Sequence, residues 1–244
     1  MRLLLFALIM PTMLCCGGSN PAIGDGVIQK DSNDLHYIVR VPSGLANHAP
    51  VLLLLHGYGS NEDDLFSFSD QIPGHWLIVS VRAPIVMSEK QFRWYDVKRV
   101  DGKIRLNFED EERSRKALIE CVDHVVKKYN ADGNRVVVAG FSQGANMSLA
   151  LALTEPDKIH AAGCFSGRFL EEVTPLITKK EALQSKQVFI AHGTEDKMLP
   201  IDYANESQKN LQSMGVKVTL STDEIGHSIS SKQLTAFVEW LTKL

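Results

Sequence analysis

The sequence lacks the short motifs by which proteins commonly hold metals, nucleotides or redox centres. Its 244 residues include four cysteines but no Cys-x-x-Cys pair, and it has no His-Glu-x-x-His motif and no glycine-rich phosphate loop. Such motifs supply the ligands of zinc sites, redox dithiols and phosphate groups. The sequence therefore indicates no metal and no cofactor.

An excess of basic charge is missing as well. The chain has 26 Lys and Arg residues against 29 Asp and Glu residues, which gives a formal net charge of -3. Its basic residues do not gather into a stripe with interleaved aromatics, the pattern that a nucleic-acid-binding surface requires. We therefore expect no nucleic-acid partner.

The N-terminal apolar run is too short to span a bilayer, which takes about 20 apolar residues. It extends from Leu3 to Leu14, after one basic residue and before two cysteines and two glycines. This order predicts an export signal. A cysteine that closes a short apolar segment resembles the bacterial lipoprotein signal, and the resemblance implies lipidation of Cys16 and a membrane-anchored protein of the bacterial cell envelope. A plain secretory signal, with a soluble secreted or periplasmic product, is the alternative.

The rest of the chain predicts one α/β domain after the signal. Residues 1–16 form the expected signal, residues 17–26 a flexible tether of Gly, Ser, Asn and Pro, and residues 27–244 the folded domain. No long polar linker divides that domain. Cys121 and Cys164 lie in a predicted helix and a predicted strand, and two buried free thiols are the default interpretation, although a disulfide is possible in an oxidising compartment.

Continuous apolar runs predict a sheet that is buried on both faces. The runs are VLLLLHGYG, WLIVSVRAP, RVVVAGFSQG, AAGCFSG and QVFIAHGTED, and each ends in turn residues. Amphipathic stretches such as DEERSRKALIECVDHVVKKYN and QLTAFVEWLTKL predict helices around them, and the alternating LHYIVRVP predicts an antiparallel edge strand. The fold class is therefore α/β, a mostly parallel, doubly wound sheet with helices on both faces. Ligands bind such sheets beyond the carboxyl ends of the strands.

Ser142 is the candidate nucleophile. It stands in the Gly-x-Ser-x-Gly pattern of GFSQG, between an apolar run and a predicted helix. A sharp turn from strand to helix exposes the serine hydroxyl at the top of the sheet, in a strained backbone that tolerates no bulk nearby.

A serine nucleophile needs a base, which this type of site takes from a histidine later in the chain. His227 lies in a loop between a predicted strand and the last helix, the position of the base in folds with the Gly-x-Ser-x-Gly turn. His160 lies at the opposite edge of the sheet and His192 within a strand terminus. We therefore predict His227 as the base, with a surface histidine as the alternative.

The base in turn needs a carboxylate, which holds its tautomer and stabilises its positive charge. The segment HGTEDKMLPID offers Glu195, Asp196 and Asp202. Asp196 fits best, because it directly follows an apolar strand and is itself followed by Pro200. The alternative is an aspartate that forms a turn and caps a helix.

Two backbone N–H groups must stabilise the oxyanion of a tetrahedral intermediate. Gln143, the residue after the nucleophile, supplies the first, and Tyr58 in the glycine-containing loop LLHGYGSNEDDL supplies the second. An ordinary glycine turn is the alternative for that loop.

Six motifs occur in order: LHGYGSNEDDL, RAP followed by FRWYD, GFSQGA, CFSG, HGTEDKMLP and GH. Together they resemble the phospholipase/carboxylesterase family, which includes bacterial carboxylesterases and acyl-protein thioesterases. The resemblance covers about Pro50 to Leu244 and implies an α/β-hydrolase fold. It also implies cofactor-free hydrolysis of carboxylic esters or thioesters by a Ser142, Asp196 and His227 triad, with Tyr58 and Gln143 at the oxyanion hole. We expect a serine carboxylesterase acting on a small-molecule ester; a lysophospholipase, thioesterase or feruloyl-type esterase, or a non-catalytic binding domain, are alternatives.

Substrate-binding residues are harder to predict. The 20 positions that separate Gly167 from Gln187 are too few for a large cap domain, so we expect an open site. Phe92, Trp94 and Tyr95 are candidates for the wall of an acyl or aromatic pocket. Aromatic packing at the end of the sheet is an equally good interpretation of them.

Overall fold

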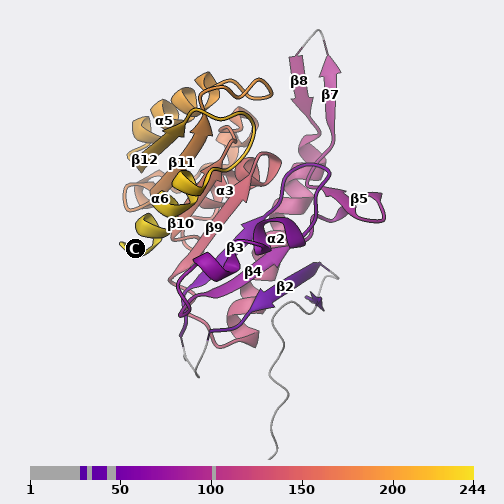
Figure 1. Ribbon diagram of the computed structural model, residues 1–244, viewed down its shortest axis with the longest axis vertical. Coiled ribbons are helices and arrows are strands. Elements are labelled where there is room, and N and C mark those ends of the chain that lie inside the picture. The colour runs from indigo at the N-terminus through magenta and orange to yellow at the C-terminus, as the bar shows by residue number, and fades with distance from the viewer. Residues whose placement is uncertain (1–27, 32–34, 43–47, 101–102) are drawn as a thin grey trace, which may run out of the picture.

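The structure is a computed structural model that describes residues 28–31, 35–42, 48–100 and 103–244 (Figure 1). The expected signal, the tether and Cys16 lie outside the described residues. Among the described helices, none combines the length and the apolar character needed to cross a membrane.

A single eight-stranded sheet forms the centre of the molecule, in the order β1-β2-β4-β3-β9-β10-β11-β12. β1–β2 and β2–β4 pair antiparallel, and the remaining neighbours pair parallel. This confirms the predicted mostly parallel sheet. The alternating segment that was expected at the edge forms β2, but the two-residue β1 pairs outside it. The strands are β1 (Gln29–Lys30), β2 (His36–Arg40), β3 (Val51–Leu55), β4 (Leu77–Val81), β9 (Val136–Phe141), β10 (Ala161–Phe165), β11 (Gln187–Gly193) and β12 (Lys217–Asp223).

Helices cover both faces of the sheet (Figure 1). β3 shows why, because Leu53 belongs to one buried cluster and Leu52 and Leu54 belong to another, as the alternation of a strand requires. The first cluster packs under α2, α3 and α5, and the second packs under α1 and α6. The helices are α1 (Asp63–Phe66), η1 (Ser69–Gln71), α2 (Phe108–Lys128), α3 (Gln143–Thr154), η2 (Glu171–Leu176), α4 (Lys180–Leu183), α5 (Asp202–Ser213) and α6 (Ser231–Leu241).

Two hairpins lie between β4 and α2. They are β5 (Ile85–Ser88) with β6 (Gln91–Arg93), and β7 (Val97–Val100) with β8 (Lys103–Leu106). The second hairpin projects from the body of the molecule (Figure 1). The segment between β10 and β11 holds only the short η2 and α4, so the domain has no large cap, as predicted.

The long helix α2 begins and ends where its sequence indicates. The Asn107 side chain accepts hydrogen bonds from the backbone N–H groups of Glu109 and Asp110, with three acidic residues in the first turn and two lysines in the last. Acidic residues at the start and basic residues at the end both stabilise a helix through its dipole. Cys121 on this helix and Cys164 on β10 are both buried and free, which agrees with the default interpretation.

Candidate active site

Ser142 occupies a strained turn between β9 and α3. Its backbone has φ 52° and ψ -112°, a left-handed conformation that is rare for a residue with a side chain. Strain of this kind persists only where the surrounding structure enforces it, and it is frequent at functional sites. The turn places the side chain beyond the carboxyl end of β9, as the sequence predicts.

The two glycines of the Gly-x-Ser-x-Gly pattern permit this turn, because backbone passes where a side chain would lie. A Cβ atom on Gly140 would lie 2.3 Å from the carbonyl carbon and oxygen of Gly144, and one on Gly144 would lie 2.0 Å from the carbonyl oxygen of Leu55. The start of α3 therefore packs directly against β9 and β3. This spacing is a steric requirement of the elbow.

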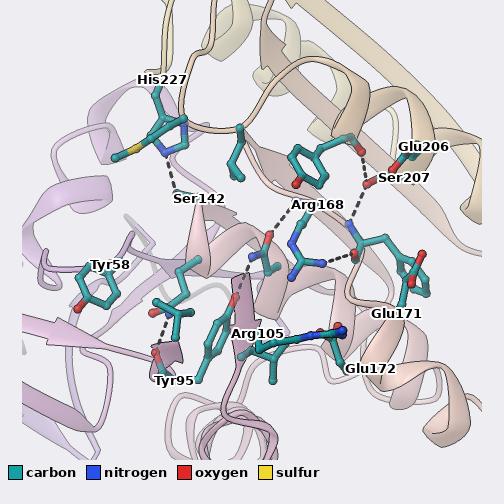
Figure 2. Close-up of a pocket in the computed structure, with 18 of the residues that line it drawn as sticks. Tyr58, Tyr95, Arg105, Ser142, Arg168, Glu171, Glu172, Glu206, Ser207 and His227 are labelled. Atoms are coloured by element: carbon teal, nitrogen blue, oxygen red, sulfur yellow. Dashed lines mark hydrogen bonds between the residues drawn. The ribbon is translucent and has the colours of Figure 1, made fainter. Parts of the chain in front are cut away.

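Hydrogen bonds connect the three predicted residues of the triad. Nε2 of His227 lies 2.9 Å from Oγ of Ser142, and Nδ1 of His227 lies 2.7 Å from Oδ2 of Asp196. The Asp196 carboxylate is buried, and its other oxygen accepts the backbone N–H groups of Met198 and Leu199, both at 2.9 Å. Asp196 is thus fixed on both oxygens, and His227 spans the gap to the serine (Figure 2 shows the bond between His227 and Ser142).

The loops that carry Asp196 and His227 meet at a third glycine. A Cβ atom on Gly193, at the end of β11, would lie 2.2 Å from the carbonyl oxygen of Ile225. Glu195 donates its backbone N–H to that same carbonyl at 3.0 Å, while its side chain is exposed. The other candidates lie elsewhere: His160 directly precedes β10, and Asp202 starts α5.

His192, which the sequence places within a strand terminus, lies beside the acid rather than beside the serine. Its buried ring donates from Nε2 to the carbonyl oxygen of Leu199 at 2.7 Å, and the same nitrogen lies 3.6 Å from Oδ2 of Asp196. The ring therefore supports the turn that carries Asp196. Its spacing four residues before Asp196 was the available signal.

The predicted oxyanion donors lie at two adjoining loops. Gln143 is the first residue of α3, and Tyr58 follows β3. Within the described part of the chain, neither backbone N–H donates to another group. Both residues line the same cavity as Ser142.

A buried hydrogen-bond network holds these loops in place. His56 donates from Nδ1 to the carbonyl oxygen of Gly57 and accepts the Ala83 N–H at Nε2, and burial lowers the pKa of His56, which keeps the ring neutral. The Gln143 side chain accepts the Trp94 N–H and donates to the Tyr95 carbonyl, both at 2.8 Å. The loop after β3, the 94–95 segment and the start of α3 are thereby tied together.

A cavity of about 710 Å³ opens beside Ser142 and His227 (Figure 2). Its lining includes Tyr58, Met198 and Leu199, and Figure 2 shows the charged side chains at the end away from His227. Arg105, Arg168, Glu171, Glu172 and Glu206 contribute those charges. Among the residues that the structure describes, no cluster of three His, Cys, Asp or Glu side chains is arranged to hold a metal ion.

Of the three aromatic candidates, only Tyr95 lines this cavity. The structure corrects the other two. Trp94 is fully buried, and its indole N–H donates to the carbonyl oxygen of His56 at 2.9 Å. Phe92 is buried beneath the guanidinium of Arg82, which lies 4.6 Å from the ring centroid. The Phe92 ring packs against Arg82 and the Trp94 ring against His56, so neither ring faces the cavity.

The mostly parallel sheet, the strained serine after β9 and the histidine before the last helix define an α/β-hydrolase. The chain belongs to the phospholipase/carboxylesterase family, whose model matches residues 36–244. Acyl-protein thioesterase 1 of Neurospora crassa is 24% identical over 216 residues, which cover 82% of this chain and 88% of that protein. Esterase YpfH of Escherichia coli is 27% identical over 214 residues, which cover 82% and 84%. The crystal structure of the Bacillus cereus carboxylesterase superposes with a TM-score of 0.73 at 26% identity, over 86% of this chain and 94% of that one.

Proposed function

We propose that the protein is a serine carboxylesterase that hydrolyses carboxylic esters through an acyl-enzyme on Ser142. The observation that carries the proposal is the continuous hydrogen-bond path from Ser142 through His227 to the buried Asp196. Family membership supports the same reaction class. The path supplies a nucleophile, a base and an acid in the order that acyl transfer needs.

In the first half of the reaction, Oγ of Ser142 attacks the ester carbonyl carbon and its proton passes to Nε2 of His227. Asp196 accepts the Nδ1–H of the ring and stabilises its positive charge. The bond to the alcohol then breaks, and the leaving oxygen takes the proton from Nε2. Water attacks the acyl-enzyme in the second half, with His227 again as base, and the acid is released as Ser142 recovers its proton.

The negative oxygen of each tetrahedral intermediate is stabilised by the N–H groups of Tyr58 and Gln143. One such donor contributes about 100- to 1000-fold to turnover in a serine hydrolase. The proposal requires no cofactor, since the residues supply every proton transfer.

A fluorophosphonate probe tests the reaction class. We expect the probe to modify Ser142, identified by peptide mass spectrometry, and we expect hydrolysis of simple esters by the same preparation. A folded protein that neither reacts with the probe nor cleaves any ester would instead be a binding domain. Esters, thioesters, lysophospholipids and feruloyl esters compared side by side separate the remaining alternatives; the thioesterase names among the relatives favour including thioesters.

We infer further that the protein is exported and anchored through a lipid on Cys16. The support is the sequence of residues 1–16, an apolar run closed by a cysteine. Several acyl chains together anchor a protein stably, since each buried methylene contributes about 0.8 kcal/mol. Intact mass of the mature protein tests this: Cys16→Ser should abolish lipidation and membrane fractionation, while Cys15→Ser should preserve both. An unmodified, soluble product lacking the signal would indicate a secreted enzyme.

A further inference from the structure

Two side chains in the cavity wall beyond Ser142 carry hydrogen-bond donors that lack acceptors among the described residues. Tyr95 is buried, and its hydroxyl accepts the Asn146 side-chain amide at 2.8 Å, which leaves the hydroxyl proton free to donate. No hydrogen bond from that proton forms within the described residues. A buried donor without an acceptor is costly unless a ligand supplies one.

Arg168 provides the second donor. Its guanidinium makes one long bond, of 3.3 Å, to the carbonyl oxygen of Phe169, and it forms no ion pair with any described carboxylate. Its backbone N–H donates to Oδ1 of Asn146 at 2.7 Å. The Asn146 side chain therefore accepts the backbone N–H of Arg168 with its oxygen and donates to the Tyr95 hydroxyl with its nitrogen, which fixes both residues relative to one another. Figure 2 shows the Arg168 side chain extending into the cavity.

The phenol remains protonated at neutral pH, because burial raises the pKa of Tyr95 to about 12, against the lowering influence of the Arg168 charge. A neutral O–H beside a guanidinium presents donors alone. The group that accepts from both is an anion with two oxygens, and a carboxylate matches the fork of a guanidinium.

The position of the base determines whether the acyl part or the alcohol part of the ester faces Tyr95 and Arg168. The leaving alcohol must lie beside His227, which protonates it. Figure 2 shows Tyr95 and Arg168 on the other side of Ser142 from His227. The subsite therefore faces the acyl part of the substrate.

We propose that Arg168 and Tyr95 form a subsite for a carboxylate at the far end of the acyl group, so that the preferred substrates are half-esters of dicarboxylic acids. The proposal rests on the proposed function and names its substrate class. Glu171 and Glu206 are exposed at the same end of the cavity, and Glu172 is half-buried. These carboxylates repel any anion at this end of the cavity, so neutralising one of them should strengthen the preference for half-esters.

The test compares monomethyl succinate, glutarate and adipate with methyl butyrate, valerate and hexanoate, which have the same numbers of acyl carbons. We expect Arg168→Gln to lower kcat/KM for the best half-ester about 10- to 100-fold, the contribution of a charged hydrogen bond. The neutral esters should change little. Tyr95→Phe should lower kcat/KM for the same half-ester by about 10-fold. Arg168→Lys should give a kcat/KM between those of wild type and Arg168→Gln. Glu172→Gln should raise the preference for half-esters.

Arg135→Gln is the matched control, since Arg135 is an exposed arginine directly before β9 that does not line the cavity, and its loss should leave the preference unchanged. A carboxylate on the alcohol part of an acetate ester should gain nothing from Arg168. Equal loss for half-esters and neutral esters in Arg168→Gln, or a wild-type preference for neutral esters, would overturn the proposal.

Binding separates this proposal from the esterase proposal. In the Ser142→Ala background, calorimetry should detect monomethyl glutarate, and Arg168→Gln should weaken that binding while methyl valerate is unaffected. An Arg168-dependent signal supports the subsite even if wild-type protein cleaves no ester. An active esterase whose Ser142→Ala variant binds both compounds equally has no such subsite.

Discussion

The two ends of the cavity differ in how their polar groups are partnered. At Ser142 the serine, His227 and Asp196 are connected by short hydrogen bonds, and Asp196 uses both carboxylate oxygens. At the other end, Arg168 and Glu172 make no ion pair with any residue that the structure describes. The first end is organised for one reaction, whereas the second leaves its charges available to a ligand. Catalysis and substrate choice are therefore separable, and substitutions at each end should show it.

Ser142→Ala should have the largest effect. Loss of a triad nucleophile can lower turnover on the order of a million-fold, while alanine keeps the size that the elbow tolerates. Steady-state hydrolysis of a neutral ester gives the rate, and circular dichroism with thermal unfolding checks that the fold is intact. Substantial activity in a folded, pure variant would remove Ser142 from the mechanism.

Asp196→Asn should come next, at roughly 10⁴-fold in turnover, because asparagine favours the wrong imidazole tautomer and carries no charge. Glu195→Gln is the matched control: it changes the adjacent carboxylate, which is exposed. We expect the control to retain nearly full activity. Greater damage from Glu195→Gln would assign the acid to the neighbouring residue.

The reaction end could be predicted from the sequence because backbone sterics and chain order determine it. Gly140 and Gly144 flank Ser142 at the spacing that the close backbone contacts require. His227 and Asp196 follow strands whose carboxyl ends share one edge of the sheet. Each signal is local, and the parallel sheet brings the separate signals together.

The far end could not be predicted in the same way, because its lining comes from the segments that hold Tyr95 and Arg168 together with the β7–β8 hairpin, η2 and α5, and no local pattern specifies how these parts pack. Phe92, Trp94 and Tyr95 are neighbours in sequence, yet only Tyr95 reaches the cavity. An aromatic residue at the end of a strand suits a core or a pocket equally well. Arg168, one residue past the CFSG motif, was visible as a polar residue after a buried strand but was not selected.

Gly193→Ala should damage the reaction end through its backbone. The added Cβ would meet the carbonyl oxygens of Ile225 and Gly226 at 2.2 and 2.4 Å, so the His227 loop must shift. We expect a loss of about 1–3 kcal/mol in the free energy of unfolding, the usual cost of overpacking, together with reduced turnover. Gly226→Ala is the control, because a Cβ there has no neighbour within 4 Å. Equal stability of the two variants in urea unfolding would contradict the steric argument.

The smallest expected effect concerns Glu111, a buried carboxyl on α2 whose charge acts on Tyr95. Neither carboxylate oxygen has a hydrogen bond, and Arg115 approaches only to 3.6 Å. Burial raises the pKa of Glu111 to about 7, against the lowering effect of Arg115. The folded protein therefore holds a proton that the unfolded chain releases near its ordinary pKa of 4.5. Stability from this group is present below that value and is lost as the pH rises to about 7.

The Glu111→Gln variant has no titrating group at this position. Its free energy of unfolding should therefore rise relative to that of wild type as the pH increases from 5 to 8. The expected gain is on the order of 1 kcal/mol, measured by urea unfolding at several pH values. Glu112→Gln is the matched control, because Glu112 pairs with Lys116 at 2.8 Å on the exposed side of α2, and that hydrogen bond lowers the pKa of Glu112. The contribution of Glu112 to stability therefore changes with pH in the opposite direction, and solvent screens it. A constant difference between Glu111→Gln and wild type over this range would mean that Glu111 stays ionised, and its charge would then have to be counted among those that repel an anion at Tyr95 and Arg168.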